Sequence, residues 1–249
     1  MTDTSEQPVA VVTGAGSGIG RAMAEGFARA GHRVVVADID ADRAHRIATE
    51  IGEHALAVAA DISDAEAVDR LVELTLHAYG RIDVLCNNAG IMDSMALPAD
   101  TSVEQWNRVI DINLTGTFLL TKAVLPHMLE RGKGAIVNTA SEAGIRGGAA
   151  GIAYTASKHG VIGITRNVAW AHAGDGIRCN AILPGPTMTG IAPDFDPAGV
   201  ARLRPIIELN QQRLATPEQM AAVAVFLASD AASFVNGAIV PVDAGWSAG

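Results

Sequence analysis

Short runs of β-branched residues alternate with helical patterns along almost the whole chain. The runs that predict strands are residues 9–13, 33–37, 56–58, 82–86, 134–139, 178–183 and 238–242. Helical patterns occupy residues 18–30, 40–51, 103–130 and 153–173, and capping boxes beginning at Ser63 and Thr216 predict two further helices. The predicted strands are apolar on both faces, as in a parallel sheet covered by helices. We therefore predict an α/β fold: a doubly wound parallel sheet of the Rossmann type, with about seven strands and helices on both faces, in a single domain spanning residues 1–249.

Composition narrows the class of protein. The 249 residues are 49% apolar and 18% charged, which allows a large core without a disulfide or structural metal. The net charge of −9 disfavours nucleic acid and anionic lipid, because both attract basic surfaces. Cys86 and Cys179 are expected to be free thiols in strands, and their spacing predicts no metal site. Residues 1–6 do not resemble a signal peptide, and we predict no apolar stretch long enough to span a bilayer, so we expect a cytoplasmic protein with no membrane partner.

A glycine-rich run from Thr13 to Gly20 directly follows the first predicted strand and opens the first predicted helix. Gly14 permits a tight turn, while Gly18 and Gly20 let the backbone approach a pyrophosphate at the helix N-terminus. The alternative is a glycine-rich turn without a ligand. The strand before the run and the helix after it favour a nucleotide site.

Three further strand ends carry polar or small residues that suit a dinucleotide. Asp38 could accept hydrogen bonds from both ribose hydroxyls of adenosine and would repel a 2′-phosphate. The glycine loop is uncharged, with Ser17 where a basic residue could meet a phosphate, so we predict NAD rather than NADP. Asp38 could instead be a solvated aspartate, and Asp61 could bind the adenine amino group or serve a turn. Residues 87–90, Asn-Asn-Ala-Gly, suit close approach to a ribose but are also an ordinary turn signal.

Tyr154 and Lys158 lie one turn apart on the same face of a predicted helix. A free tyrosine has a pKa of about 10, and a nearby ammonium or an oxidised nicotinamide ring would favour its ionised form. Ser141 follows the fifth predicted strand, and its hydroxyl could hold the substrate oxygen in line with Tyr154. The amide of Asn113 could hold a water beside Lys158, or it could face solvent or bond its own backbone. The Tyr-Lys spacing alone is weak; its joint occurrence with Ser141 and the glycine loop predicts proton transfer.

Taken together, these motifs resemble the short-chain dehydrogenase/reductase superfamily, in its compact single-domain branch, over nearly the whole chain. The residues that carry the likeness are 13–20, 87–90, Asn113, Ser141, 154–158 and 184–189. The resemblance implies a catalytic tetrad in which Tyr154 is the general acid/base and Ser141 polarises the carbonyl. Lys158 would lower the tyrosine pKa and bind ribose, and Asn113 would support a water relay.

The resemblance also implies NAD contacts from residues after the sixth predicted strand, and a homodimer or homotetramer joined through the fourth and fifth helices and the last strand. The proline-rich stretch 184–213 would be a substrate lid. The predicted dinucleotide-binding residues are Gly14, Ser17, Gly18, Ile19, Gly20, Asp38, Asp61, Ile62, Asn88, Ala89, Gly90, Tyr154, Lys158, Pro184, Gly185, Thr187 and Thr189.

The predicted substrate is a secondary alcohol or ketone. The pocket walls are expected from residues 91–95, 142–151 and the lid, with an apolar surface from Met92, Met95, Met188, Ile191 and Phe195. Its possible polar handles are Glu142, Arg146, Asp93 and Asp194, of which Asp194 could simply face water. Glu142 after the serine, Asp243-Ala244-Gly245 near the end and Pro186 depart from the common family pattern. Two alternatives stay open: an NADP-dependent 3-oxoacyl-type reductase and a non-catalytic dinucleotide-binding sensor or scaffold.

Overall fold

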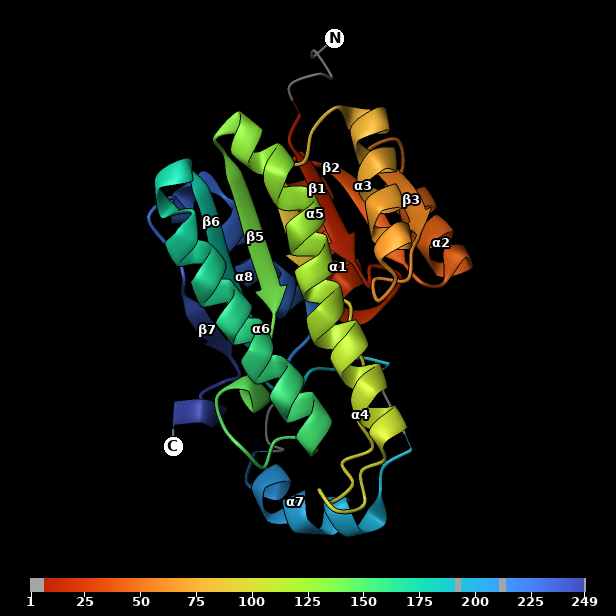
Figure 1. Ribbon diagram of the computed structural model, residues 1–249, viewed down its shortest axis with the longest axis vertical. Coiled ribbons are helices and arrows are strands. Elements are labelled where there is room, and N and C mark those ends of the chain that lie inside the picture. Colours follow the sequence, from red (N-terminus) through yellow and green to blue (C-terminus); the bar gives the residue numbers. More distant parts are fainter. Residues whose placement is uncertain (1–6, 191–193, 211–213, 249) are drawn as a thin grey trace.

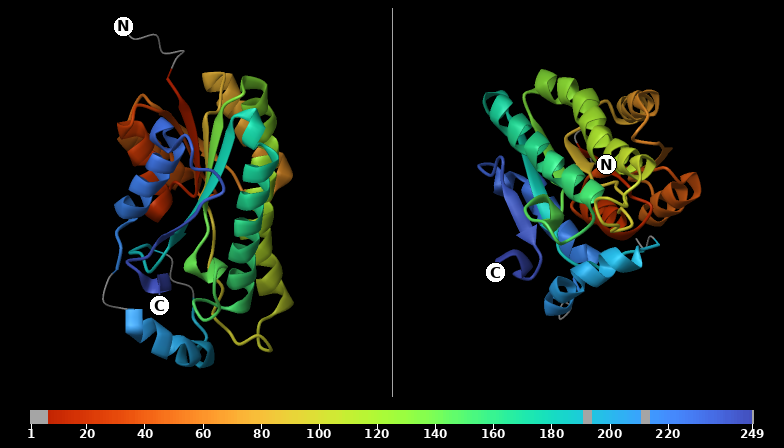
Figure 2. Two further views of the ribbon diagram at one scale, coloured as in Figure 1. Left: turned by 90° about the vertical axis from the view of Figure 1, so that its left-hand side faces the viewer. Right: turned by 60° about the horizontal axis from the view of Figure 1, so that its bottom comes forward.

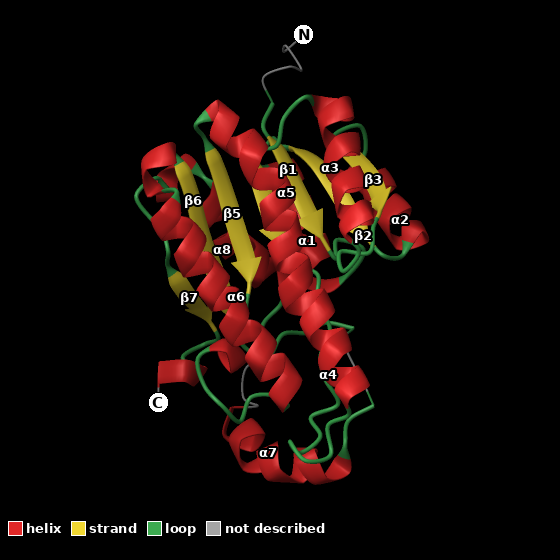
Figure 3. Cartoon of the chain, in the orientation of Figure 1, coloured by secondary structure: helices red, strands yellow, loops and turns green. Residues whose placement is uncertain are grey.

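The computed structural model describes residues 7–190, 194–210 and 214–248 (Figure 1). Residues 1–6 and parts of the expected lid, 191–193 with Ile191 and 211–213, lie outside the described residues. Within the described ranges, seven strands form one parallel sheet in the order β3-β2-β1-β4-β5-β6-β7 (Figure 3). The strands are β1 (Val9–Thr13), β2 (Arg33–Asp38), β3 (Ala55–Ala59), β4 (Val84–Asn87), β5 (Gly134–Thr139), β6 (Ile177–Pro184) and β7 (Ile239–Val242). The predicted doubly wound parallel sheet is therefore confirmed.

Helices cover both faces of this sheet, as Figure 2 shows in its left-hand view. One face carries α1 (Gly18–Arg29), α2 (Ala41–Ile51) and α8 (Pro217–Ala228). The other carries α3 (Ala65–Tyr79), α4 (Val103–Ile110), α5 (Gly116–Arg131) and α6 (Ile152–Ala171). Each layer buries its own apolar cluster, around Phe27 on the first face and around Leu120 on the second. Both side chains are completely buried, so the two-sided apolar pattern of the strands is explained.

One of the two predicted capping boxes was wrong. The N-cap of α3 is Asp64, whose carboxylate accepts from the backbone N–H of Glu66 at 3.0 Å. Ser63 is not available for capping, because its hydroxyl donates to Asp61 at 2.6 Å. The second box is confirmed: Thr216 caps α8, and its N–H donates to the side chain of Gln219 at 2.9 Å.

The long helix predicted over 103–130 is one continuous helical run from Val103 to Arg131, but it contains a π-turn, η1 (Asp111–Thr115), between α4 and α5. By length and composition this run could cross a membrane, so the prediction that no stretch is long enough was wrong. One such helix is weak evidence for a membrane span. Here Leu120, Val124 and Met128 are completely buried against the sheet, as in the core helix of a globular fold.

Residues 184–213 contain a helix that was not predicted, α7 (Pro197–Asn210). Pro197 is its first residue, where proline is well tolerated. The helix lies beyond the carboxyl ends of the strands (Figure 1). At the base of this segment Thr187 and Ala215 form an isolated parallel bridge, so its two ends are joined.

Candidate active site

The predicted site residues gather at the carboxyl edge of the sheet, around the ends of β1, β4 and β5 and the first half of α6 (Figure 1). In an open α/β sheet this edge, where the strand order reverses, is the general ligand site. Here β1 pairs with both β2 and β4, so the reversal lies beside the glycine-rich loop.

The glycine loop has the geometry of an anion cradle. Gly14 has a φ of +63°, and a Cβ on it would lie 2.9 Å from the Cα of Ala89. A Cβ on Gly20 would lie 2.1 Å from the carbonyl oxygen of Gly14, so neither position has room for a side chain. Ser17 makes no capping bond within the described part of the chain, and the first turn of α1 holds no acid. The first N–H groups of α1 are thus open to a pyrophosphate, and a nicotinamide dinucleotide fits this cradle.

The remaining predicted contacts of the cradle lie around it. Ser17 is exposed, and Ile19 packs at the edge of the α1 layer. A Cβ on Gly18 would lie 3.4 Å from Thr189, which therefore faces the loop. Thr187 donates to the carbonyl of Gly185 at 2.9 Å. Pro184 is the last residue of β6.

Asp38 is a part of the glycine loop and not a solvated strand end. It is 9% exposed, and its Oδ2 accepts from the N–H of Gly16 at 2.8 Å. Its Oδ1 accepts from the N–H of Asp40 at 3.0 Å. Arg43, which the sequence reasoning did not consider, packs its Cβ against Gly16 and pairs with Asp40 at 3.0 Å. The carboxylate thus lies against the glycine loop, at the carboxyl end of β2.

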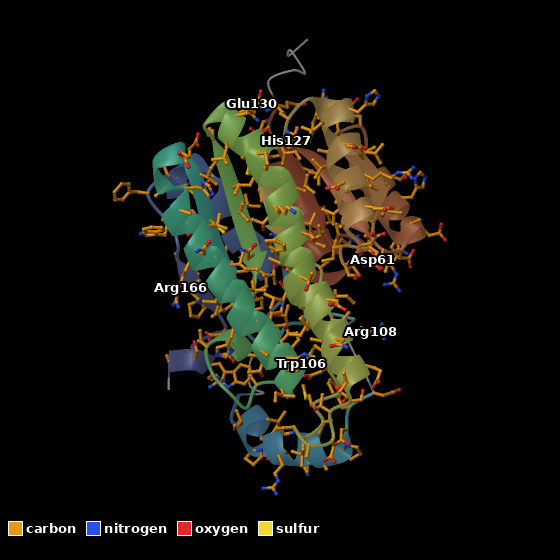
Figure 4. The ribbon with its side chains drawn as sticks, viewed as in Figure 1. Asp61, Trp106, Arg108, His127, Glu130 and Arg166 are labelled. Atoms are coloured by element: carbon orange, nitrogen blue, oxygen red, sulfur yellow. The ribbon has the colours of Figure 1, made fainter. Side chains whose placement is uncertain are left out.

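Asp61 is exposed beside α3, as Figure 4 shows. Its Oδ1 accepts from the N–H of Ser63 at 2.9 Å and from its hydroxyl, so the turn role is present in the structure. Ile62 is 6% exposed and packs against Gly116, where a Cβ would lie 2.8 Å away. The Ile62 side chain is therefore a core contact, and its predicted contact with the dinucleotide stays a prediction.

The end of β4 is fastened to the glycine loop through Thr13. The Thr13 hydroxyl accepts from the N–H groups of Asn88 and Ala89 at 3.0 and 3.1 Å. The Asn88 amide also donates to the Thr13 carbonyl at 3.0 Å. Gly90 lies where a Cβ would approach Lys158 Nζ to 3.5 Å, so this turn connects the cradle to the proton-transfer residues.

Tyr154, Lys158 and Ser141 come together as predicted. Lys158 is 3% exposed, and its Nζ donates to the carbonyl of Thr139 at 2.8 Å. The same Nζ lies 5.4 Å from the centroid of the Tyr154 ring. The Ser141 side chain lies close enough to the Tyr154 phenol to lower its pKa. The phenol, the serine and the lysine amine therefore lie together at one place.

The electrostatics of this trio differ from the prediction. Burial raises the pKa of Tyr154 from 10.0 to about 12; the hydrogen bond from Ser141 lowers it, and the charge of Asp93 raises it further. Burial also lowers the pKa of Lys158 from 10.5 to about 8. Desolvation therefore dominates the pKa of the phenol, and the nearby lysine does not make it acidic. The remaining stabilisation of the phenolate would come from the positive ring of an oxidised dinucleotide.

Asn113 lies inside the π-turn, a feature that often marks a functional position. Its Oδ1 accepts from the N–H of Ile91 at 2.8 Å, and its Nδ2 donates to the Ile91 carbonyl at 2.9 Å. Nδ2 also donates to Ser157 at 3.2 Å. The amide thus holds the loop after β4 against α6, and the expected water beside Lys158 stays a prediction.

Two of the four polar residues that were predicted to contact the substrate, Asp93 and Asp194, take other roles. Asp93 is 2% exposed and bonds three backbone N–H groups, so its assignment as a handle was wrong. Asp194 is exposed, in line with the alternative that it faces water. Met188 and Phe195 expose apolar surface near the site, as expected, at 53% and 41%.

The other two handles, Glu142 and Arg146, belong to a cluster with the C-terminal segment. Arg146 Nη2 donates to Glu142 Oε2 at 3.0 Å, and its guanidinium lies 4.4 Å from the Trp246 ring centroid. Among the described residues no donor reaches Glu142 Oε1, yet Glu142 and Asp243 are hydrogen-bonded. A bond between two carboxyl groups requires a proton on one of them. Burial, then Asp243, raises the pKa of Glu142 from 4.5 to about 7, against the effect of Arg146, so Glu142 carries that proton.

Asp243 is the ionised partner. Burial opposes its charge, but hydrogen bonds from Ser247 and Glu142 hold its pKa below the ordinary value. Its two oxygens accept from the N–H groups of Gly245 and Ser247 at 2.8 and 2.9 Å. Glu142, the residue that follows Ser141, is thus bonded to the C-terminal segment through Asp243.

We expect Glu142→Gln to reduce the pH dependence of stability. A raised carboxyl pKa stabilises the fold fully below 4.5, and this contribution is lost as the pH rises through about 7. Glutamine can donate to Asp243 at every pH. Thermal unfolding should give a higher Tm for Glu142→Gln than for the wild type well above pH 7, with little difference at acidic pH. Glu130→Gln, at an exposed site on α5 (Figure 4), is the control; equal pH profiles for all three proteins would contradict the shared proton.

Comparisons with known proteins agree with this site. A family model described as enoyl-(acyl carrier protein) reductase matches residues 14–247. The 3beta-hydroxysteroid dehydrogenase 2 of Eggerthella lenta is 37% identical over 260 residues, covering 100% of both chains. The cis-4-hydroxycyclohexanecarboxylate dehydrogenase of Sinomonas cyclohexanicum is 43% identical over 254 residues, again covering 100% of both.

Solved structures are similar over the same length. A 3-ketoacyl-(acyl-carrier-protein) reductase from Brucella melitensis complexed with NADH has a TM-score of 0.87 and 37% identity, covering 96% of this chain and 98% of that one. A protein described as an NAD(P) dependent gluconate 5-dehydrogenase from Beutenbergia cavernae, with NADP bound at low occupancy, has a TM-score of 0.87 and 42% identity, covering 99% of each. The chain therefore belongs to the short-chain dehydrogenase/reductase superfamily, oxidoreductases that bind a nicotinamide dinucleotide and transfer hydride between alcohols and ketones.

Proposed function

We propose that the protein is an NAD-linked dehydrogenase of a ring-bearing secondary alcohol, with Tyr154 as general acid/base. The observation that carries the proposal is the grouping of Tyr154 and Ser141 beside the buried amine of Lys158, whose Nζ lies 5.4 Å from the centroid of the tyrosine ring. This trio lies at the same sheet edge as the open N-terminus of α1. A proton-transfer group and a dinucleotide cradle are thereby combined at one edge of the sheet.

Each residue has a defined task in this proposal. The bound dinucleotide supplies the hydride acceptor or donor. Ser141 holds the substrate oxygen by a hydrogen bond, and Tyr154 takes its proton during oxidation or returns it during reduction. Lys158, fixed by the Thr139 carbonyl at 2.8 Å, would bind the nicotinamide ribose and stabilise the phenolate. Asn113 would hold the loop after β4 in place through Ile91.

The substrate class follows from the relatives and the apolar surroundings. The two relatives described above are named as dehydrogenases of compounds with a hydroxyl on a carbon ring. Exposed Met188 and Phe195 offer apolar surface at the site. A panel of cyclic and acyclic secondary alcohols, their ketones and a 3-oxoacyl thioester, followed by nicotinamide absorbance, tests this. Fastest turnover of the thioester would favour the reductase alternative.

NAD is the proposed cofactor because Asp38 lies at the glycine loop with both carboxylate oxygens facing backbone N–H groups. A 2′-phosphate placed there would meet this negative charge. The solved relatives contain NADH in one case and NADP in another, so the proposal rests on Asp38 itself.

Asp38→Ala is expected to raise the ratio of kcat/KM for NADP to kcat/KM for NAD by about tenfold to a hundredfold, since charged hydrogen bonds to NAD are lost with the repulsion of NADP. Asp38→Asn, which keeps the acceptor to Gly16, separates charge from loop stability. Exposed Asp42→Ala is the control. An unchanged ratio in both Asp38 variants would show that another residue reads the ribose.

We further propose a cytoplasmic homo-oligomer, a dimer or tetramer, that takes a small-molecule substrate and no nucleic acid, membrane or metal partner. The net charge of −9 supports the exclusion of polyanions. An apolar groove between α5 and α6, with half-exposed Phe118 at its edge, supports association through these helices. Analytical ultracentrifugation that found only monomer would contradict this part.

A further inference from the structure

Asp93 is a buried carboxylate in the loop between β4 and α4, and its hydrogen bonds all reach backbone. It is 2% exposed. Its Oδ1 accepts from the N–H groups of Met95 at 3.1 Å and Gly151 at 3.0 Å, and its Oδ2 accepts from the N–H of Tyr154 at 2.9 Å. A Cβ on Gly151 would lie 2.5 Å from Asp93 Oδ2, so the close approach depends on that glycine. One side chain thus bonds both its own loop and the catalytic helix.

For α6, Asp93 acts as an N-cap supplied from elsewhere in the chain. The N-cap residue of α6 is Gly151, which has no side chain to accept a bond, and the first turn contains no acid. Asp93, 58 residues away from Gly151, provides the acceptor and a negative charge at the positive end of the helix. The N–H that Oδ2 holds is that of Tyr154 itself. A displacement of this first turn therefore displaces the phenol directly.

The start of α7 packs against the same loop. The N–H of Asp196 donates to the carbonyl of Ser94 at 2.7 Å. A Cβ on Gly199, in the first turn of α7, would lie 1.7 Å from the carbonyl oxygen of Met95. Met95 has a φ of +59°, which is unusual for a residue with a side chain, and its N–H is held by Asp93. Figure 1 shows this loop between α6 and α7.

Electrostatics oppose a carboxylate at this position. The charged groups that face Tyr154 are Lys158 and Asp93, with Ser141 as a neutral partner. The charge of Asp93 raises the pKa of Tyr154, which works against its use as a base. The Asp93 carboxylate disfavours ionisation of the phenol, so its charge does not explain its presence. The backbone N–H groups that it holds do explain it.

We propose that Asp93 is a positioning residue. It couples the packing of α7 against residues 94–95 to the position of Tyr154. The coupling is made by the two carboxylate oxygens of Asp93, which bond both the turn at Met95 and the first turn of α6. It rests on the proposed function, because the positioned group is the general acid/base of that function.

The experiment compares Asp93→Ala and Asp93→Asn with Asp64→Ala in the full-length protein. Asp64 is the N-cap of α3, so its removal costs a comparable helix cap away from Tyr154. We expect Asp93→Ala to lower kcat by about tenfold to a hundredfold with a smaller change in KM for the dinucleotide, as misplacement of a reacting group predicts. Hydrogen exchange should accelerate in peptides from the start of both α6 and α7. Asp64→Ala should change neither kcat nor exchange in those peptides.

Asp93→Asn keeps one acceptor and removes the charge, so it remains informative if the alanine variant does not fold. We expect it to regain part of kcat and to move the pH profile of oxidation toward lower pH, because the phenol loses a neighbouring negative charge. Unchanged exchange in α7, or kcat within about twofold of the wild type in both variants, would overturn the proposal. A wild-type protein that turns over no alcohol would instead overturn the proposed function. The hydrogen-exchange data would still test whether Asp93 couples α7 to the first turn of α6.

Discussion

Tyr154→Phe is expected to reduce kcat by about 10²- to 10⁴-fold while dinucleotide binding stays close to that of the wild type. Phenylalanine keeps the ring that packs near Lys158 but has no oxygen to exchange a proton with the substrate or to bond Ser141. The cradle at Gly14 and α1 is untouched, so the dinucleotide still finds its pyrophosphate site. Fluorescence titration with NADH and steady-state rates on the same preparation give both quantities.

The chain offers a matched control for this substitution. Tyr79 is the only other tyrosine in the sequence and lies on α3, where its ring is contacted by Arg33 at 5.1 Å. Tyr79→Phe should leave kcat unchanged. Near-normal turnover by Tyr154→Phe would remove the tyrosine mechanism, and loss of NADH binding along with kcat would point to damage to the fold.

The fold was predictable because its signals are local. Each strand of a two-sided parallel sheet is a continuous apolar run, and such runs stand out between amphipathic helices, as 9–13 and 134–139 do. The glycine loop was equally readable, since its function depends on residues that are adjacent in sequence. The helix α7 was missed because Pro197 and Pro205 suggested irregular backbone; Pro197 begins the helix, and Pro205 lies inside it.

The site was predictable in its members but not in its couplings. Tyr154 and Lys158 share a helix face, which spacing alone reveals. Asp93 was assigned to the substrate because its true partners, Gly151 and Tyr154, are 58 and 61 residues away in the sequence. The contact of Asn113 was not predicted for the same reason: its amide bonds Ile91, 22 residues away. Long-range contacts of this kind depend on how the carboxyl ends of β4 and β5 meet, which no local pattern encodes.

The pKa values were the least predictable feature. A lysine one turn from a tyrosine suggests an acidic phenol, but the sequence carries no measure of burial. In the folded protein desolvation dominates both groups, raising the pKa of Tyr154 and lowering that of Lys158. The protonation states of Tyr154 and Lys158 therefore depend on whether a charged group, such as the ring of an oxidised dinucleotide, is bound beside them.

Lys158→Met separates the charge of this residue from its packing. Methionine fills a similar volume but has no ammonium to donate to the Thr139 carbonyl, to bind a ribose or to stabilise a phenolate. We expect kcat/KM to fall by about a hundredfold or more, because both cofactor positioning and proton transfer are affected. Exposed Lys133→Met, which loses only a surface ion pair with Asp230, is the control and should keep full activity.

Stability should move in the opposite direction from activity. The pKa of Lys158 is lowered to about 8, so the folded state disfavours the charged amine at pH values below that, and this destabilisation disappears as the pH rises toward 10.5. Removing the amine should therefore leave Tm unchanged or higher at neutral pH, with the difference from the wild type shrinking at alkaline pH. A Tm that fell together with kcat/KM would mean that the Thr139 bond outweighs the desolvation of Lys158, and the residue would then be structural before it is catalytic. A protein that is more stable than the wild type but inactive would instead show that the cost of burying this charge is retained for the chemistry.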